Sequence, residues 1–317
     1  MDTLEKVLPR TIYMTVAGSH LYGTNVAGSD YDFKGVAVAP TEYYLGSLKS
    51  FEQLERKVEK GHPHDLTITA LWKFVGLCAE CNPNVVELLF ANDDQVIHID
   101  EFGEELRTMR ELFITKKAKH TFSGYAHGQL KRIKTHRSWL LNPPKDKPSR
   151  EQFGLGDTTK VSKSELGAFE SIVKDGLEVE LPKDVLTLFL RERQYQAAKT
   201  QYEQYENWKR SRNQSRAQLE AKFGYDTKHA MHLIRLMTMC VEILETGKMN
   251  VFREDRDELV AIRYGSMTYD QLIERSEMLE KRCAELYETS KLPHEPNRVL
   301  IDKKLVDMTQ RYLRKHG

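Results

Sequence analysis

Alternating hydrophobic and polar positions near the start of the chain predict β-strands. Residues 11–17, TIYMTVA, alternate and are rich in β-branched side chains. Residues 33–39, FKGVAVA, predict a second strand, which Pro40 ends because proline cannot donate a ladder hydrogen bond. Residues 51–58 alternate in the same way and predict a third.

The period of the hydrophobic pattern then changes. Within residues 64–81, HDLTITALWKFVGLCAEC, it passes from about two to about 3.6, which predicts a helix after an extended segment. Two short apolar runs, NVVELLF and QVIHI, complete a small α/β unit by about residue 112. The predicted first domain therefore spans residues 1–112.

From residue 113 to residue 317 the pattern is helical, which predicts a second domain. Residues 226–247 show strong helical periodicity, and Gly247 suits a helix C-cap. We also expect a basic helix at 113–140, a long charged helix at 184–222, and closing helices at 268–289 and 298–315. Residues 141–165 are rich in Pro, Gly and Ser, so we expect a mobile loop there and, around it, a charged insertion at about 145–220.

Composition excludes some classes of protein and leaves others open. Of the 317 residues, 40% are hydrophobic and 30% charged, with a formal net charge of +1, which is typical of a globular protein with a real core. No apolar run is long enough to span a membrane and the first residues lack a signal-peptide core, so we expect a cytoplasmic protein. Cys78 and Cys81 form a C-x-x-C pair, but without a second close pair we interpret them as buried structural cysteines.

The loop between the first two strands carries the candidate chemistry. It reads GSHLYGTNVAGSDYDFKG from Gly18 to Gly35. Asp30 and Asp32 are two residues apart, so in an extended chain their carboxylates lie on one face and suit a hard cation such as Mg²⁺. Gly18 and Ser19, directly after a strand, can present a backbone N–H and a hydroxyl to a phosphate. The same letters would also suit an ordinary turn.

The order of these parts resembles the signature of the DNA polymerase β-like nucleotidyltransferase superfamily. That signature is a strand, Gly-Ser, about a dozen residues, and Asp-x-Asp at the start of the next strand, which AGSHLYGTNVAGSDYDFKGV matches. The chain is similar to the RNA-repair-pathway DNA polymerase beta branch, found in bacteria and phages. Three further segments carry that resemblance: KF-x-x-L…NPN-x-x-ELLF, GYD-x-KHAMHLIRL and SKLP.

The resemblance implies an α+β fold, with a small mixed-sheet, polymerase β-like palm domain and a mostly helical C-terminal region. It implies two Mg²⁺ (or Mn²⁺) ions on three carboxylates, which would be Asp30, Asp32 and Asp65. Asp65 can also be read as a turn or helix N-terminal acid. An NTP, with ATP expected, would be held at Gly18, Ser19, His20 and Ser29. At His20 many relatives carry Arg, which affects one phosphate contact.

Positive charge recurs in the helical region. One helical face is expected to carry Lys228, His232 and Arg235. This face would either bind phosphate or simply be exposed to solvent. Arg263 is a weaker candidate for the same role. Basic clusters with interleaved aromatic residues favour contacts to an RNA backbone. The alternative is that they are the solvent-exposed faces of ordinary helices. The candidate RNA-binding residues are Lys131, Arg132, Lys134, Arg137, Lys209, Arg210 and Arg212.

The resemblance, together with the basic clusters, implies a Mg²⁺-dependent nucleotidyltransferase that moves a nucleoside monophosphate from an NTP to a hydroxyl, with an RNA or tRNA 3′ end as the preferred acceptor. One alternative is an adenylyltransferase acting on a protein, for example a toxin partner, or on a small molecule. Another is an inactive nucleotide-binding module, against which the intact Gly18, Ser19, Asp30 and Asp32 argue. The resemblance also suggests an RNA ligase as partner, which no residue here demonstrates.

Overall fold

The computed structural model describes residues 3–56, 64–158, 161–174 and 182–316. Two compact units make up the chain. The sheet unit consists of Met1–Ile133 and Asp226–Gly317, and the inserted unit consists of Lys134–Tyr225. The boundaries of these units differ from the expected division between residues 1–112 and 113–317. The end of the catalytic domain at residue 112 stays a prediction.

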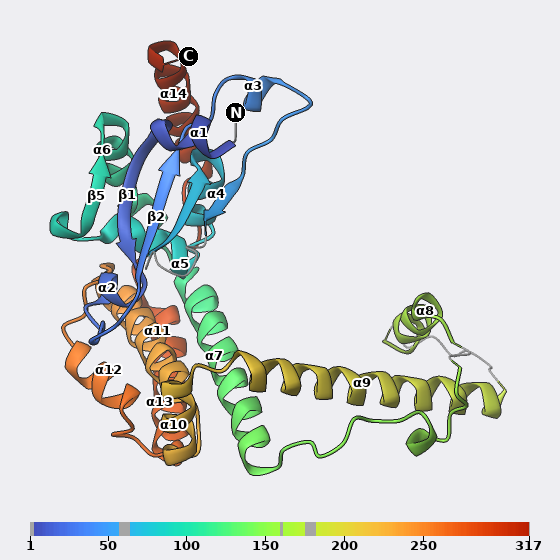
Figure 1. The fold of residues 1–317 in the computed structure, drawn as a ribbon. Coiled ribbons are helices and arrows are strands. Elements are labelled where there is room, and N and C mark those ends of the chain that lie inside the picture. Colours follow the sequence, from blue (N-terminus) through green and yellow to red (C-terminus); the bar gives the residue numbers. More distant parts are fainter. Residues whose placement is uncertain (1–2, 57–63, 159–160, 175–181, 317) are drawn as a thin grey trace. The chain divides into compact units, whose positions relative to one another are not determined.

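A five-stranded mixed sheet forms the centre of the sheet unit (Figure 1). Its strands are β1 (Thr11–Ala17), β2 (Tyr31–Ala37), β3 (Gln53–Arg56), β4 (His64–Ala70) and β5 (Val96–Ile99), in the order β3-β4-β2-β1-β5. The β2 and β4 strands are parallel, and the other neighbours are antiparallel. The predicted α+β class with a mixed sheet is confirmed, and the three predicted strands correspond to β1, β2 and β3. Residues 57–58 of the third prediction lie outside the described residues.

Burial changes along β2 and β4 rather than alternating. In β2 the side chains of Tyr31 to Lys34 are exposed or half-buried, whereas Gly35 to Ala37 are buried. In β4 exposure likewise falls from His64 toward Ala70. Because both strands run in the same direction, their exposed ends lie together at one end of the sheet. That end carries the predicted acids.

Helices and apolar side chains close the other end of the sheet. A core cluster there consists of Val7, Ala37, Ala39, Phe51, Ile68 and Ala70. It is next to the short helices α1 (Thr3–Val7) and α3 (Glu42–Leu45), and Tyr43 and Tyr44 pack against it. Burial of these apolar surfaces fixes the sheet at that end and leaves the acidic end open.

The remaining helices of the N-terminal segment follow the strands closely. They are α2 (Gly18–Tyr22), α4 (Leu71–Ala79), α5 (Pro83–Val86), α6 (Glu101–Thr108) and the first part of α7 (Ala118–Leu141), with short 3₁₀ turns at Leu8–Arg10, Glu87–Phe90, Asp93–Gln95 and Arg110–Phe113. The buried residues Leu71, Phe74, Val75 and Cys78 of α4 are those that the period of 3.6 predicted.

Four C-terminal helices complete the sheet unit: α11 (Thr227–Thr246), α12 (Arg256–Arg263), α13 (Tyr269–Thr289) and α14 (Arg298–His316). The predicted helices at 226–247, 268–289 and 298–315 are confirmed, and Gly247 caps α11 with a φ of 71°. Helix α14 is tied to the N-terminal segment, because Arg311 pairs with Glu105 at 2.6 Å and Lys315 with Glu101 at 2.5 Å. The sheet unit is therefore discontinuous in sequence.

The inserted unit contains the end of α7, a 3₁₀ turn (Glu151–Phe153), α8 (Lys163–Lys174), α9 (Lys183–Ser211) and α10 (Gln214–Phe223). The single helix expected at 184–222 is wrong, since the chain leaves the helix at Arg212 and starts α10 with Asn213 as its N-cap. The Asn213 side chain accepts hydrogen bonds from the backbone N–H groups of Ser215 and Arg216. The loop expected at 141–165 contains the 3₁₀ turn and the start of α8, and residues 159–160 lie outside the described residues.

All four cysteines are free and buried, including Cys78 and Cys81. Burial raises the pKa of the Cys78 thiol well above its ordinary value and raises that of Cys81 to about 11. Both side chains are therefore neutral at physiological pH, which agrees with the structural interpretation of the C-x-x-C pair. Among the described residues, no helix combines the length and the apolar composition that crossing a lipid bilayer would take.

We predict that Gly103→Ala destabilises the sheet unit by at least about 2 kcal/mol. A Cβ atom at Gly103 in α6 would lie 2.1 Å from the carbonyl oxygen of Ile12 in β1, so strand and helix would have to separate. Gly128→Ala in α7 is the matched control, because its Cβ would meet nothing within 4 Å. It should stabilise the protein by about 0.5–1 kcal/mol. Urea unfolding measures both, and equal midpoints for the two variants would contradict the prediction.

Candidate active site

The Gly-Ser turn starts directly at the end of β1. Gly18 is the first residue of α2 and has a φ of 61°, a conformation that glycine adopts without strain. A Cβ atom at Gly18 would lie 2.7 Å from Oδ2 of Asp32. The predicted phosphate-holding turn and a predicted metal-binding carboxylate therefore lie against each other, and only glycine leaves room for this approach.

The sheet register brings two of the predicted acids together. In β2, Asp32 pairs with Ala17 of β1 on one side and with Asp65 of β4 on the other. Paired residues of neighbouring strands point to the same face, so the carboxylates of Asp32 and Asp65 lie side by side. Asp30 is exposed and comes directly before β2.

The electrostatics of Asp32 show which charges surround it. Its pKa is raised, first by burial and then by the negative charges of Asp65 and Asp30, whereas the positive charges of Lys34 and Lys228 lower it. The structure thus brings Asp30, Asp32, Asp65 and Lys228 together, from the N-terminal and C-terminal segments of the sheet unit. The carboxylates of Asp30, Asp32 and Asp65 form an all-oxygen donor set that fits Mg²⁺.

Lys34 is a site neighbour that our reading of the sequence missed. It lies two residues after Asp32 in β2, so it points to the same face. Its Nζ donates a hydrogen bond to the backbone carbonyl of Asn84 at 3.1 Å. The alternation of the strand was the signal that could have identified it.

His20 and Ser29 meet across the loop that connects α2 to β2. The His20 ring nitrogen Nε2 lies 3.4 Å from the carbonyl oxygen of Ser29, and the Ser29 hydroxyl accepts a hydrogen bond from the Val26 N–H at 2.9 Å. The imidazole of His20 also stacks on Tyr31, with ring centroids 3.7 Å apart. These contacts order the loop, and a phosphate-binding role for either residue stays a prediction.

The three predicted phosphate contacts of α11 differ in environment. Lys228 is exposed and His232 half-buried, but Arg235 is only 4% exposed. The guanidinium of Arg235 lies over the Tyr22 ring, 3.6 Å from its centroid, and 3.5 Å from Oε2 of Glu87. The Tyr22 hydroxyl donates to Oε1 of Glu87 at 2.5 Å. We therefore propose that Arg235 positions α2 rather than binding phosphate.

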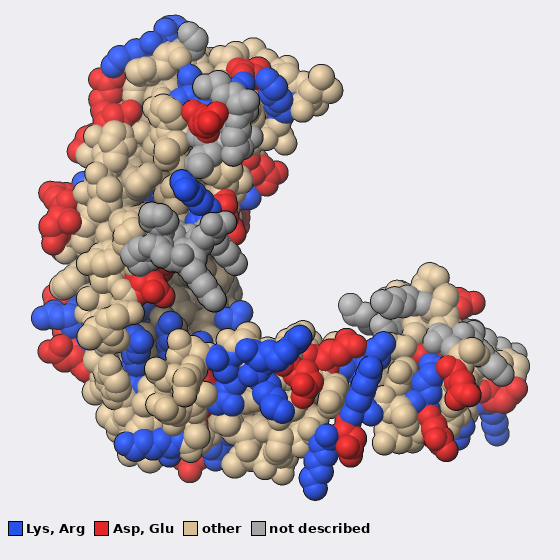
Figure 2. Space-filling view, in the orientation of Figure 1, with Lys and Arg blue, Asp and Glu red and all other residues tan. Residues whose placement is uncertain are grey.

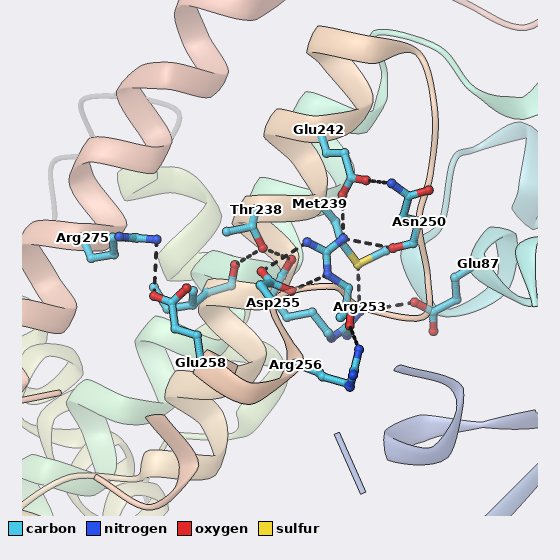
Figure 3. A network of polar contacts seen from close by, with 12 residues as sticks. Glu87, Thr238, Met239, Glu242, Asn250, Arg253, Asp255, Arg256, Glu258 and Arg275 are labelled. Carbon is cyan, nitrogen blue, oxygen red and sulfur yellow. Dashed lines mark hydrogen bonds and ion pairs between the residues drawn. The ribbon is translucent and has the colours of Figure 1, made fainter. Parts of the chain in front are cut away.

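Other segments also hold α2. Gln95 donates hydrogen bonds to the carbonyl oxygens of His20 and Leu21, both at 3.0 Å. The backbone N–H of Arg253 donates a hydrogen bond to the carbonyl oxygen of Tyr22 at 3.0 Å. A Cβ atom at Gly23 would collide with the Phe252 ring. Figure 3 shows the network around Arg253, whose guanidinium pairs with Glu242 at 2.6 Å and Asp255 at 2.9 Å. The Gly-Ser turn is therefore anchored by the C-terminal helices as well as by the sheet.

The predicted RNA-binding residues are divided between solvent and internal contacts. Lys131, Arg132 and Lys134 are exposed on α7. Within the inserted unit, Arg137 donates to the carbonyl of Gly224 at 2.8 Å, and Arg212 pairs with Glu220 at 2.6 Å.

Arg212 also lies over the Trp208 ring, 4.2 Å from its centroid. Lys209 lies over the Tyr205 ring, and Arg210 bonds to Asn207. Figure 2 shows blue and red side chains mixed along the inserted unit rather than one uniformly basic face.

We predict that Asp32→Asn raises the melting temperature at pH 7 by about 2–4 °C. Because the folded pKa of Asp32 is raised, the folded protein binds its proton more tightly than the unfolded chain does. Stability therefore falls as pH rises through the carboxylate range toward the folded pKa, and the loss is complete above it. The amide carries no charge and escapes that loss, so the two proteins should converge near about pH 3.

Divalent cations should separate the same two proteins. Mg²⁺ should raise the melting temperature of the unaltered protein at pH 7 and leave that of Asp32→Asn almost unchanged, because the variant lacks the central ligand. Asp94→Asn, an exposed acid of another turn, serves as control and should behave like the unaltered protein. A stability gain in Asp32→Asn that persists equally at low pH would show that packing, not charge, is responsible.

The N-terminal part of the chain is similar to a known protein family. Residues 2–141 match the family described as the RNA repair pathway DNA polymerase beta family. No curated protein matches the chain. Among solved structures, a nucleotidyltransferase-like protein from Exiguobacterium sibiricum matches at 10% identity, covering 96% of this chain and 74% of that one. Its TM-score of 0.26 is too low to carry an argument.

The family match spans α2, the whole sheet and the predicted acids Asp30, Asp32 and Asp65. The register of β2 and β4 independently brings two of those acids together. Residues 2–141 are therefore similar to the RNA repair pathway DNA polymerase beta family, and this match supports a nucleotidyltransferase of the polymerase beta type.

Proposed function

We propose that this protein transfers a nucleoside monophosphate from an NTP to the 3′ hydroxyl of an RNA. The observation that carries the proposal is the carboxylate pair of Asp32 and Asp65 beside Gly18. Asp30, Asp32 and Asp65 would hold divalent cations, Mg²⁺ or Mn²⁺, which when bound neutralise phosphate charge and activate the attacking hydroxyl. ATP is the NTP that we expect.

The protein's own residues account for the rest of the reaction. The attacking hydroxyl oxygen forms a bond to the α-phosphorus, and the bond from that phosphorus to the pyrophosphate oxygen breaks. The hydroxyl proton passes to solvent and pyrophosphate leaves. Gly18 and Ser19 offer a backbone N–H and a hydroxyl where the phosphates would lie. Lys228 and Lys34 contribute positive charge beside Asp32, which favours the negatively charged triphosphate at this end of the sheet.

The second part of the proposal is that the acceptor hydroxyl belongs to RNA. Its support is the family, whose description names RNA repair, together with the exposed Lys131, Arg132 and Lys134 of α7. Such cations favour contacts to a phosphate backbone. Proteins and small molecules carry hydroxyls as well, so they are tested as acceptors beside RNA.

Labelling experiments identify the acceptor. Incubation with Mg²⁺ and each α-labelled NTP should put label into RNA with a 3′ hydroxyl and leave RNA with a 3′ phosphate unlabelled. Asp30→Ala and Asp65→Asn should reduce the label to background, whereas Asp302→Asn, an exposed acid of α14, should leave it unchanged. Label in lysate protein or in small molecules alone would replace the RNA acceptor, and no label with any acceptor would refute the proposal.

The role of Arg235 has a separate test. Arg235→Met leaves Glu87 as an unpaired buried charge and should destabilise the protein by about 3 kcal/mol. It should also raise the KM for NTP about tenfold, because the Gly-Ser turn loosens. Adding Glu87→Gln removes that charge, so the double variant should recover most of the stability and part of the KM.

A direct phosphate contact by Arg235 would give a different pattern. Glu87→Gln would then restore stability in the double variant without improving the KM for NTP. Thermal unfolding and steady-state kinetics on the same preparations distinguish the two roles.

A further inference from the structure

Four rings gather at the open end of the sheet. His20 stacks on Tyr31 with centroids 3.7 Å apart and planes 16° apart, and the His64 ring meets Tyr31 at 5.7 Å and Phe33 at 5.2 Å. Tyr31 and Phe33 are 6.3 Å apart. We refer to His20, Tyr31, Phe33 and His64 as the aromatic cluster.

Each ring is next to, or one residue from, a predicted site residue. His20 follows Ser19, Tyr31 and Phe33 flank Asp32, and His64 precedes Asp65. Since side chains alternate along a strand, the rings of β2 and β4 point to the face opposite the carboxylates. The aromatic cluster and the acids therefore occupy two faces of the same exposed end.

The aromatic cluster is not part of the core. None of its four residues is buried, and Tyr31 is 43% exposed. The core cluster on that face lies toward the other end of the sheet, with the half-buried Leu66 packed against it. Tyr31 and His64 are exposed, and His20 and Phe33 are half-buried. Accessible rings beside a reactive site favour a ligand with flat, apolar faces.

Arg56 adds a positive charge to the same face. In the sheet register, Leu66 pairs with Phe33 on one side and with Arg56 on the other, so all three point the same way. Arg56 is exposed. Aromatic rings with a nearby guanidinium are the combination that binds single-stranded nucleic acid, because the rings stack on bases and the cation meets phosphate.

We propose that the aromatic cluster stacks on a base of the RNA acceptor strand near its 3′ end. The inference rests on the proposed function, since it names where that acceptor lies. The triphosphate must lie on the carboxylate face, whereas the strand rings point to the other face, which leaves them accessible to the acceptor strand. A strand that crosses the exposed end of β2 and β4 places its terminal hydroxyl on one face and a preceding base on the other.

The test uses binding without catalysis. A fluorescent single-stranded RNA and an oligonucleotide of equal length with abasic positions near its 3′ end are titrated onto the unaltered protein without NTP. The intact RNA should bind about tenfold more tightly. Tyr31→Ala should abolish that difference, whereas Tyr31→Trp should keep it. Tyr264→Ala, which removes another ring of the sheet unit at 52% exposure, is the matched control and should also keep it.

Two further measurements keep the inference independent of folding and of the proposed function. Thermal unfolding checks Tyr31→Ala, and His64→Ala repeats the test if that variant is unstable. Equal binding of intact and abasic strands by the unaltered protein, or full discrimination by a folded Tyr31→Ala, would overturn the stacking site. RNA labelling that persists alongside either result would leave the proposed function standing, whereas label in protein alone would refute the acceptor and leave the binding result valid.

Discussion

The parallel pairing of β2 and β4 is the constraint on which the site depends. It places Asp32 directly beside Asp65, two like charges that repel each other at the open end of the sheet. The fold tolerates this arrangement because the apolar core fixes the other end of both strands. The lysines near Asp32 offset part of the repulsion, and a bound cation would offset the rest. Binding of a cation at this site would therefore also relieve the repulsion between Asp32 and Asp65.

The site also depends on residues that lie far beyond the matched N-terminal region. The family match ends at residue 141, yet Arg235 of α11 and Arg253 of the segment between α11 and α12 contact α2. Both arginines are buried and paired with carboxylates, so their contribution is geometric. A nucleotidyltransferase domain cut at the end of the match would keep its carboxylates and the Gln95 contacts to α2, but would lose the contacts from Arg235 and Arg253.

Hydrophobic periodicity and capping residues predicted those features of the fold that depend on residues close together in the sequence. The strand at β1 and the Gly247 cap follow from neighbouring residues and could be predicted. The close approach of Gly18 to Asp32 was not predicted, because it follows from the pairing of β1 with β2. The burial of Arg235 could not, because a helical pattern counts arginine as polar and does not show that Glu87, 148 residues away, lies opposite. The break at Arg212 was missed for a related reason. The residues on both sides of it have good helix propensity, and the sequence pattern did not show that Asn213 caps a new helix.

The discontinuity of the sheet unit has a consequence for the order of folding. Residues 134–225 separate the sheet from α11, so a ribosome finishes the strands and the Gly-Ser turn long before it makes the residues that anchor the turn. Closing so long a loop costs little more free energy than closing a shorter one, but contacts between distant segments form slowly. The turn is thus synthesised well before the C-terminal residues that hold it in place. Competence for catalysis should therefore arrive late, after the inserted unit has left the ribosome.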